Sequence, residues 1–563
     1  MNARNGLATG RDRLQRVVRM AMDPAYRRDE RAHHHAFLQF ASQYGPALQW
    51  DCTQGTPPTR PVLLVGIGFP DGVQTELGLL KGLQIAGLTP VVLTRRDRWL
   101  QRYYALAGVE RPLCWDEFLA PSSRPALKDI MDSLQSVEDL LRLEYGGARI
   151  GRVTAATLLR RFWLGSLNVR DPQIRRRLGS AIASAMGHAR AAHAIVRHVK
   201  PQLALFADRG YSPQGELFDV CLAEGIDVIT WNVAHKSNTL MLKRYTAANR
   251  DEHHTSLSPE SWRRLQAMEW TPAHRRRLQE ELSRCYASGE WYSEVGTQFH
   301  TRTVEPSAVR SKLGLDPDKK TAVIFPHIFW DGTFFWGTDL FRSYEEWFLE
   351  TVKAACANPA VNWIIKVHPG HLVKMARQRR HEVPLEVAAI QRHIGRLPGH
   401  VRLLPADTEI STLSLFGVMD YGLTVRGTVG LEAASFGIPV LTAGTGRYDG
   451  RGFTMDSRTR EEHLTKVARI HDIPPLSPEQ RELAERFAYG VFVMRPLPLS
   501  TMTMEYERDA TASLKTRIHA RTKDDWLRAP DLQAFAEWIA DRHRIDFLRD
   551  DELADDLAHQ HRG

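Results

Sequence analysis

The sequence lacks the features that mark secreted and membrane-spanning proteins. Its five cysteines, at positions 52, 114, 221, 285 and 356, are far apart, form no CxxC pair and are odd in number, which argues against a disulfide framework and favours a reducing compartment. No apolar run approaches the about 20 residues that cross a bilayer, and the first residues, MNARNGLATGRDRLQR, have no apolar signal segment. We therefore expect a cytoplasmic protein whose association with the inner face of the plasma membrane is at most peripheral.

The motifs of several enzyme and binding classes are also missing. There is no GxxxxGK[ST] phosphate loop, no GxSxG nucleophile turn and no kinase signature. Asp316 and Asp318 form the only DxD-like pair, in a stretch typical of a surface turn, and His368 and His371 have no evident third ligand, so we expect no obligatory metal or cofactor. The net charge of +9 is modest for 563 residues and includes no long Lys/Arg run, so nucleic acid is not an expected partner.

What the sequence does contain is an alternation of apolar strands and helices, which predicts an α/β protein with doubly wound parallel sheets. We expect a helical N-terminal extension at 1–52, a Rossmann-like acceptor-side domain with helical insertions at 60–304, a second Rossmann-like domain at 305–474 and a helical region at 475–563. The strands expected in the second domain are Thr321–Phe325, Trp363–Val367, Val401–Leu404, Tyr421–Val425 and Pro439–Thr442. The helices expected between them are Asp339–Ala357, Met375–Gly395, Ser411–Val418 and Val429–Phe436.

The first Rossmann-like domain opens with the strand and glycine-rich turn PVLLVGIGF. Its glycine spacing, GxGxxxG, differs from the dinucleotide fingerprint, and Thr94 and Arg95 stand where a ribose-binding acid would be expected, so NAD binding is not predicted. The turn leaves room for an acceptor to approach the backbone. Asp71 in this turn, and Asp208 and Arg209 after the later strand 203–207, are the acceptor-side candidates.

The stretch YGLTVRGTVGLEAASFGIPVLTA, residues 421–443, predicts a parallel strand–helix–strand unit. Thr428 is a natural N-cap and Gly437 is placed to end the helix. The first N–H groups of the helix, the charge of Arg426 and the bare backbone at Gly430 together make an anion site suited to phosphate. A plain turn with an exposed arginine is the competing interpretation.

Other polar residues follow the remaining strands, and all five loops are expected to face one crevice. His368 shares a strand face with Lys366 and is presented by Pro369, and it is either a phosphate ligand or a structural histidine. Asp331, among Trp and Phe, would have a raised pKa and act as a base, or it simply forms a turn before glycine. Glu432 would accept from ribose hydroxyls, or it favours the helix N-terminus. The other loop residues are His327 and Trp330, Asp407 and Thr408, and Gly444, Gly446, Arg447 and Tyr448.

The motifs IIKVHPG and GTVGLEAASFGIPVL resemble those of capsule polysaccharide biosynthesis proteins, which are similar to capsule-type β-Kdo transferases with the GT-B fold. The resemblance extends over about residues 320–450. It rests on His368-Pro369, on Thr428, Gly430 and Glu432-Ala433, and on the run Gly437 to Val440. It implies two Rossmann-like domains facing a central cleft. A CMP- or NDP-linked sugar donor would be held by Lys366, His368, Pro369, Arg426, Thr428, Gly430 and Glu432.

The resemblance also implies a metal-independent glycosyltransferase that builds a cell-surface polysaccharide. In this mechanism Asp331 and His368 are the catalytic candidates, with cations and the helix dipole stabilising the departing phosphate. The expected partners are a glycan or lipid-linked acceptor and polysaccharide assembly proteins at the inner membrane. The same motifs are shared loosely with non-hydrolysing sugar-nucleotide epimerases. An epimerase and a non-catalytic capsule biosynthesis or export accessory are therefore the alternatives.

Overall fold

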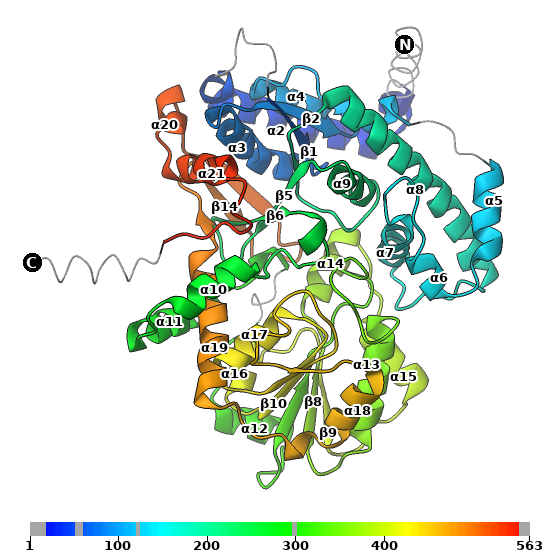
Figure 1. Ribbon diagram of the computed structural model, residues 1–563, viewed down its shortest axis with the longest axis vertical. Helices are drawn as coiled ribbons and strands as arrows, with labels where there is room; N and C mark the ends of the chain where they lie inside the picture. Colours follow the sequence, from blue (N-terminus) through cyan, green and yellow to red (C-terminus); the bar gives the residue numbers. More distant parts are fainter. Residues whose placement is uncertain (1–17, 51–59, 120–123, 296–300, 551–563) are drawn as a thin grey trace, which may run out of the picture.

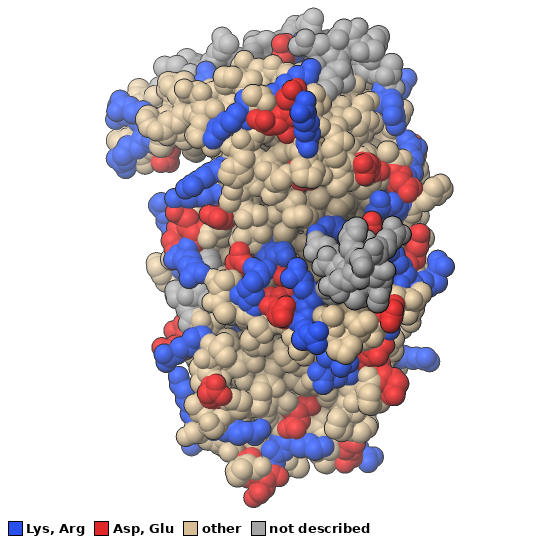
Figure 2. Space-filling view, turned by 90° about the vertical axis from the view of Figure 1, so that its left-hand side faces the viewer, with Lys and Arg blue, Asp and Glu red and all other residues tan. Residues whose placement is uncertain are grey.

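The computed structural model describes residues 18–50, 60–119, 124–295 and 301–550. It contains two lobes stacked along the long axis of the molecule, each built on its own β-sheet (Figure 1). No helix in the described ranges is long and apolar enough to cross a membrane. On the face shown in Figure 2, basic and acidic side chains are interspersed, so the excess of positive charge is not gathered there into a single patch.

The N-terminal sheet has the order β13-β6-β5-β4-β1-β2-β3. Its five strands from β5 to β3 are parallel, while β6 and β13 extend the sheet antiparallel beyond β5. The strands are β1 (Pro61–Val65), β2 (Thr89–Thr94), β3 (Leu113–Cys114), β4 (Leu203–Phe206), β5 (Asp227–Val233), β6 (Thr239–Tyr245) and β13 (Leu497–Pro498).

The C-terminal sheet has the order β12-β11-β10-β7-β8-β9 and is parallel throughout. In both sheets the first strand lies beside the fourth, so the strand order reverses at that pair as in a doubly wound fold. The strands are β7 (Thr321–Ile324), β8 (Asn362–Lys366), β9 (Val401–Leu404), β10 (Tyr421–Thr424), β11 (Val440–Thr442) and β12 (Met455–Asp456). Two such domains facing one another form the GT-B-like arrangement that the sequence predicted.

Helices cover both faces of each sheet, which explains why the central strands are continuous apolar runs. In β1, Val62 and Leu64 pack toward one helix layer and Leu63 and Val65 toward the other. The N-terminal helices are α2 (Pro24–Leu48), α3 (Pro70–Ile85), α4 (Arg98–Leu106), α5 (Arg124–Ser133), α6 (Val137–Leu141), α7 (Ile150–Phe162), α8 (Pro172–Val199), α9 (Gln214–Ala223), α10 (Pro259–Ala267) and α11 (Pro272–Ser288). The C-terminal helices are α12 (Pro306–Leu313), α13 (Tyr344–Cys356), α14 (Gly370–Gln378), α15 (Leu385–His393), α16 (Thr412–Phe416), α17 (Thr428–Ser435) and α18 (Arg460–Ala468).

Three sequence predictions about elements are wrong. The single helix Met375–Gly395 is two helices, α14 and α15, because Arg379 ends the first in the left-handed region and Pro384 precedes the second. Strand β6 was not predicted, because it carries Lys243 and Arg244, whose charges hide the strand pattern. Both are buried and paired, Lys243 with Asp546 at 3.0 Å and Arg244 with Asp227.

The third error concerns the C-terminal region, which was predicted to be helical throughout. It contains α19 (Pro478–Tyr489), α20 (Lys523–Leu527) and α21 (Pro530–Ala540), but also β13 and a hairpin of β14 (Met502–Tyr506) and β15 (Leu514–Ile518). Helix α19 packs on α17 of the C-terminal domain, whereas α21 packs on α3 of the N-terminal domain. The chain therefore returns across both lobes.

One loop of the C-terminal domain is embedded in the N-terminal domain. Ile328, Trp330 and Phe334 follow β7 but belong to the hydrophobic cluster formed by α7, α8 and α9. The ring of Trp330 stacks on that of Trp163, with centroids 4.5 Å apart. The two lobes are therefore held together at this point by apolar packing as well as by polar contacts.

Candidate functional site

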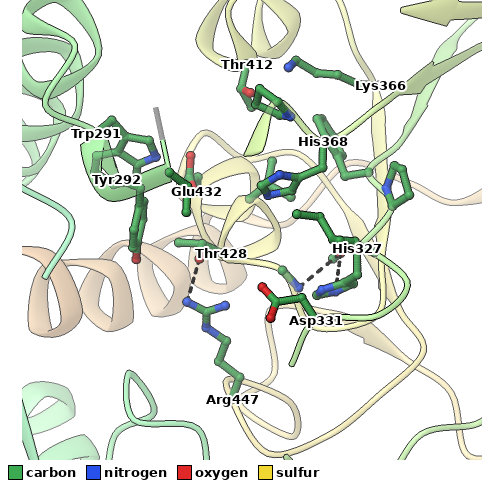
Figure 3. Close-up of a pocket in the computed structure, with 18 of the residues that line it drawn as sticks. Trp291, Tyr292, His327, Asp331, Lys366, His368, Thr412, Thr428, Glu432 and Arg447 are labelled. Carbon is green, nitrogen blue, oxygen red and sulfur yellow. Dashed lines mark hydrogen bonds between the residues drawn. The ribbon is translucent and has the colours of Figure 1, made fainter. Parts of the chain in front are cut away.

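The principal cavity lies at the carboxyl edge of the C-terminal sheet, where its strand order reverses. It has a volume of about 290 Å³ and is lined by the segments that follow β7, β8, β10 and β11, together with residues before α12. The lining residues are Tyr286, Trp291, Tyr292, Val295, Phe325, Pro326, His327, Ile328, Asp331, Lys366, His368, Pro369, Lys374, Thr412, Thr424, Gly427, Thr428, Val429, Glu432 and Arg447 (Figure 3). This is the position at which open α/β sheets bind ligands.

Four of the five loops predicted to share a crevice contribute to this cavity. The exception is the loop with Asp407 and Thr408 after β9, neither of which lines it. Strand β9 is the edge strand on that side of the sheet, so its loop lies farthest from the reversal point. Thr412 at the start of α16 lines the cavity instead, a residue that the sequence did not single out.

Lys366, the last residue of β8, brings an uncompensated positive charge to the cavity. Its side chain is 4% exposed, and among the described residues it has no ion pair and no side-chain hydrogen bond. Burial lowers the pKa of the ammonium group to about 8. A buried cation with no protein partner is costly unless a ligand supplies the opposite charge, so Lys366 marks an anion site.

His368 presents a hydrogen-bond donor to the same space. Its Nδ1 atom accepts from the backbone N–H of Gly370 at 3.0 Å, which leaves the proton of the neutral ring on Nε2. Burial, with His371 and Lys366 nearby, lowers the pKa of the ring to about 3. His368 is therefore a neutral N–H donor at physiological pH and carries no charge.

Arg447 and the start of α17 complete the positive side of the cavity. The N-cap of α17 is Gly427, and Thr428 is the first helical residue, so the prediction that Thr428 caps the helix is wrong. Thr428 Oγ1 instead accepts from Arg447 Nη2 at 2.6 Å (Figure 3). Among the described residues the guanidinium of Arg447 pairs with no carboxylate and donates only to neutral oxygens. The sequence placed Arg447 in the correct loop but gave it no role.

Arg426 and Gly430 do not serve the cavity as predicted. Arg426 is 2% exposed and its guanidinium is bound by Asp339 at 2.5 Å and by the Tyr344 hydroxyl at 3.3 Å. Gly430 is also buried, and a Cβ there would lie 2.1 Å from the Tyr448 hydroxyl. Arg426 therefore neutralises an internal carboxylate, and Gly430 makes room for a tyrosine instead of a ligand.

Glu432 lies opposite the cations, against an aromatic wall. Its carboxyl group accepts hydrogen bonds from the Tyr286 hydroxyl and the Trp291 indole, and burial raises its pKa to about 7. Tyr286 and Trp291 stack with centroids 5.1 Å apart, and Tyr292 meets Trp291 edge-on. The sequence prediction placed this segment among the helical insertions of the 60–304 domain and did not identify the wall, although the aromatic residues of the segment were a usable signal.

Asp331 lines the cavity, but the predicted rise in its pKa is wrong. Burial alone would raise the pKa, yet Lys374 at 2.6 Å, Arg160 at 3.5 Å and a hydrogen bond from Tyr211 hold it well below the usual range. Tyr211 and Arg160 belong to the N-terminal domain, and Tyr211 also accepts from Gly332 N–H at 3.0 Å. Asp331 is thus the centre of an ion-pair bridge between the domains.

The three acceptor-side candidates differ in where the structure places them. The side chain of Asp71 lies outside the described residues. Asp208 follows β4 at the reversal point of the N-terminal sheet, is 47% exposed and lies 3.9 Å from Nη1 of Arg160, the same nitrogen that pairs with Asp331. Arg209 is buried, donates to the carbonyls of Arg250 and Glu252 and lies over aromatic rings. It is a structural residue, and its assignment to the acceptor site is wrong.

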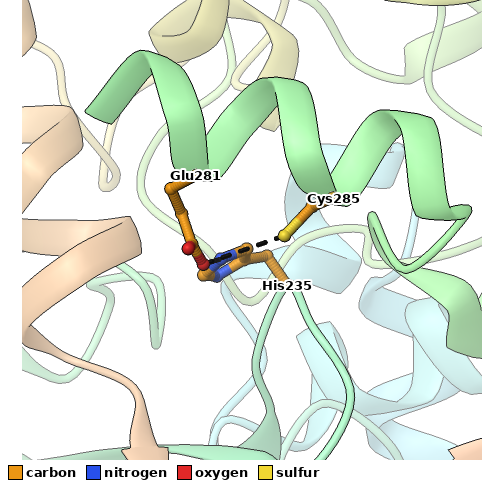
Figure 4. Close-up of side chains that lie close together, drawn as sticks. All are labelled: His235, Glu281 and Cys285. Carbon is orange, nitrogen blue, oxygen red and sulfur yellow. Dashed lines mark hydrogen bonds and ion pairs between the residues drawn. The ribbon is translucent and has the colours of Figure 1, made fainter. Parts of the chain in front are cut away.

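Within the described ranges one side-chain cluster has the composition of a metal site: His235, Glu281 and Cys285 (Figure 4). Glu281 already accepts from His235 at 2.9 Å and pairs with Lys236 at 2.6 Å and Arg284 at 3.0 Å. Two cations therefore balance its charge where an ion would bind. His235 also accepts at its backbone oxygen from Tyr292 N–H, 2.7 Å away, so the cluster braces the aromatic wall.

Comparison with known proteins gives one family match and several distant structural likenesses. Residues 288–473 match the family described as capsule polysaccharide biosynthesis protein. A β-Kdo 2,4 transferase, KpsC of Thermosulfurimonas dismutans, is 14% identical and aligns with a TM-score of 0.34 over 58% of this chain and 87% of its own. A UDP-GlcNAc 2-epimerase from Neisseria meningitidis, bound to UDP-GlcNAc, is 11% identical, with a TM-score of 0.25 over 76% and 95%.

A glycosyltransferase from Rickettsia africae is 9% identical, with a TM-score of 0.25 over 86% of this chain and 99% of its own. At these identities and TM-scores the likenesses assign no activity. No curated protein matches the sequence. The family match covers the region that provides nearly every residue of the cavity.

Proposed function

We propose that this chain, whose residues 288–473 match the capsule polysaccharide biosynthesis family, is a glycosyltransferase that uses a nucleotide-activated sugar to build a cell-surface polysaccharide. The observation that carries the proposal is the cavity at the strand reversal of the C-terminal sheet. There, cations without carboxylate partners face a buried carboxyl group and an aromatic wall.

The charge balance of the cavity favours an anionic ligand. Of its two carboxyl groups, Asp331 is neutralised by Lys374 at 2.6 Å, and Glu432 is about half protonated at pH 7. Lys366 and Arg447 remain uncompensated. In the proposal these cations, the His368 Nε2–H and the first N–H groups of α17 bind the donor phosphate and stabilise the charge of the departing nucleotide. Because protein cations supply this charge, we propose that transfer needs no divalent metal.

The opposite side of the cavity suits the nucleoside of a CMP- or NDP-linked sugar. Glu432 would accept from ribose hydroxyls with the oxygen positions left free by Tyr286 and Trp291. The rings of Trp291 and Tyr292 would pack against the base, which aromatic side chains hold regardless of its identity. A volume of about 290 Å³ is at the lower end of the range for small-molecule sites.

For the proton of the acceptor hydroxyl, we propose Asp208 in preference to Asp331. A carboxylate whose pKa is held low by two cations is a weak base. Asp208 is more exposed, and its contact with Arg160 is longer, 3.9 Å against 3.5 Å for Asp331. Asp208→Asn should therefore lower kcat more than Asp331→Asn. Equal or reversed losses would exclude Asp208 as the base.

The proposal is tested by calorimetric titration of CMP, UDP, GDP and CDP into the wild-type chain and Lys366→Gln. We expect one nucleotide to bind best and the variant to lose at least tenfold in affinity, because it removes the unpaired cation. Lys353→Gln, an exposed lysine paired with Glu350 on α13, is the matched control and should bind as wild type. If no nucleotide binds the wild-type chain, or if Lys366→Gln binds unchanged, the assignment is wrong. Product analysis with donor alone then separates transfer from epimerisation.

A further inference from the structure

A second cavity lies between the two domains. It has a volume of about 300 Å³ and is lined by α6 and α7 of the N-terminal domain and by residues 334–342 of the C-terminal domain. The loop from Asp331 to Asp339 separates it from the principal cavity, because Asp331 lines the first and Phe334 and Asp339 line the second. Neither the family match nor the sequence motifs assign a role to this space.

Arg152 of α7 is the unbalanced charge in the second cavity. Its only hydrogen bond is from Nη1 to the backbone oxygen of Phe334 at 3.3 Å, and among the described residues it forms no ion pair. Burial and the neighbouring Arg149 lower the pKa of its guanidinium, and these effects outweigh the opposing influence of Asp251 and Asp339.

Within the described residues, neither acidic residue of the cavity, Asp339 or Glu138, forms an ion pair with Arg152. Asp339 is bound to Arg426 at 2.5 Å. Glu138 acts electrostatically on Arg342, which also pairs with Glu346 at 2.9 Å. Arg152 therefore faces the cavity with its remaining N–H groups available to a ligand, and Asp339 and Asp251 act on it electrostatically without pairing with it.

The remaining walls are apolar and come from both domains. Val137 and Leu141 lie on the N-terminal side, and Phe334, Leu340 and Phe341 on the C-terminal side. A guanidinium set among apolar walls suits a sugar ring that bears a carboxylate or phosphate, since the anion meets the arginine and the C–H faces of the ring meet the walls.

We propose that this second cavity binds an anionic sugar residue of the acceptor chain, with Arg152 as its counter-ion. The inference rests on the proposed transferase function, because it takes the neighbouring cavity as the donor site. It adds a substrate class, because the acceptor would carry a carboxylate or a phosphate. This group would bind on the other side of the Asp331–Asp339 loop from the donor. The loop from Asp331 to Asp339, which lines both cavities, would then contact both substrates.

The test uses three matched probes with the full chain: a glucuronate-terminated disaccharide, the same disaccharide reduced to the neutral glucoside, and its 6-phosphate. We expect the wild-type chain to bind an anionic probe on the order of tenfold tighter than the neutral one, and the tighter of the two anionic probes identifies the acceptor group. Arg152→Gln should abolish the preference and Arg152→Lys should keep part of it. Arg142→Gln, an exposed arginine just after α6 that is paired with Asp139, should behave as wild type.

Nucleotide titration of the same variants separates this inference from the proposed function. Arg152→Gln should leave nucleotide affinity unchanged, whereas Lys366→Gln should lower nucleotide affinity and leave the preference for anionic disaccharides intact. A wild-type chain without that preference, or an Arg152→Gln variant that retains it, overturns the inference. If the wild-type chain binds no nucleotide, the donor assignment is overturned. The disaccharide measurement still tests the role of Arg152 in that case.

Discussion

The two sheets have the same strand reversal but use it differently. In the C-terminal domain the reversal between β7 and β10 opens into a cavity with unpaired cations. In the N-terminal domain the turn after β1 is filled from within: the Tyr104 hydroxyl lies where a Cβ of Gly66 would be, and it bonds to the buried carboxyl of Glu76 at 2.5 Å. Topology therefore determines where a site can form, and the side chains behind the strand ends determine whether one does.

The largest expected effect concerns the difference between paired and unpaired cations. Asp339→Ala should destabilise the protein by about 3–5 kcal/mol, because it leaves the buried Arg426 without its carboxylate. Lys366→Gln should cost little or no stability, since no protein partner is lost. Thermal and urea denaturation of both variants tests this difference. Asp472→Ala, an exposed acid paired with Arg469, is the control, and an equal loss in Asp339→Ala would show that Arg426 does not depend on its partner.

The second prediction concerns the pH dependence of stability, to which one buried glutamate in each domain contributes. Burial raises the pKa of Glu76 to about 8 and that of Glu432 to about 7, both from 4.5. Because the folded state holds these protons more tightly than the unfolded state, the contribution of each group is complete below pH 4.5 and is lost as pH rises through its folded pKa. Glu76→Gln should therefore remove a decline of about 5 kcal/mol between pH 4.5 and 8.

Glu432→Gln should remove a smaller decline, which ends near pH 7. Denaturation midpoints between pH 4 and 9 give both slopes. If the two variants flatten the same pH range by the same amount, the filled and the open reversal points do not differ in the way described.

The smallest effect concerns packing behind the start of α17. Gly430→Ala should cost about 1–3 kcal/mol, because the new methyl group would overlap the Tyr448 hydroxyl. Tyr448→Phe in the same chain should recover part of the loss. Nucleotide affinity should change less than in Lys366→Gln. A large loss of affinity with unchanged stability would return Gly430 to the ligand site.

The sequence predicted the parallel C-terminal sheet and the edge that holds the cavity, because apolar runs between turn residues are local signals. Lys366, His368, Thr428 and Glu432 were placed correctly for the same reason: each lies at or just beyond the carboxyl end of a strand. The sequence did not predict which charged side chains pair across the fold. The sequence does not reveal that Arg426 is paired with Asp339, nor that, among the described residues, the Arg447 guanidinium has no carboxylate partner.

Asp331 shows that the ion pairs of an acidic residue could not be predicted from the sequence either. Its aromatic neighbours in sequence predicted a raised pKa, whereas Lys374 and Arg160, distant in sequence, lower it. The aromatic wall at Trp291 and Tyr292 was missed because it comes from a helical connector that faces the sheet only after the chain folds back. Local pattern thus predicts elements and edges, while pairing between distant segments determines the chemistry.

The loop that buries Trp330 against Trp163 belongs to one domain by connectivity and to the other by packing. If the lobes swing apart, this loop is held by the N-terminal side and takes Ile328 and Asp331 away from Lys374 and His368. The principal cavity would then lose a wall, so the open form would hold the proposed donor more weakly than the closed form. Tight binding of the proposed donor and closure of the lobes would therefore occur together.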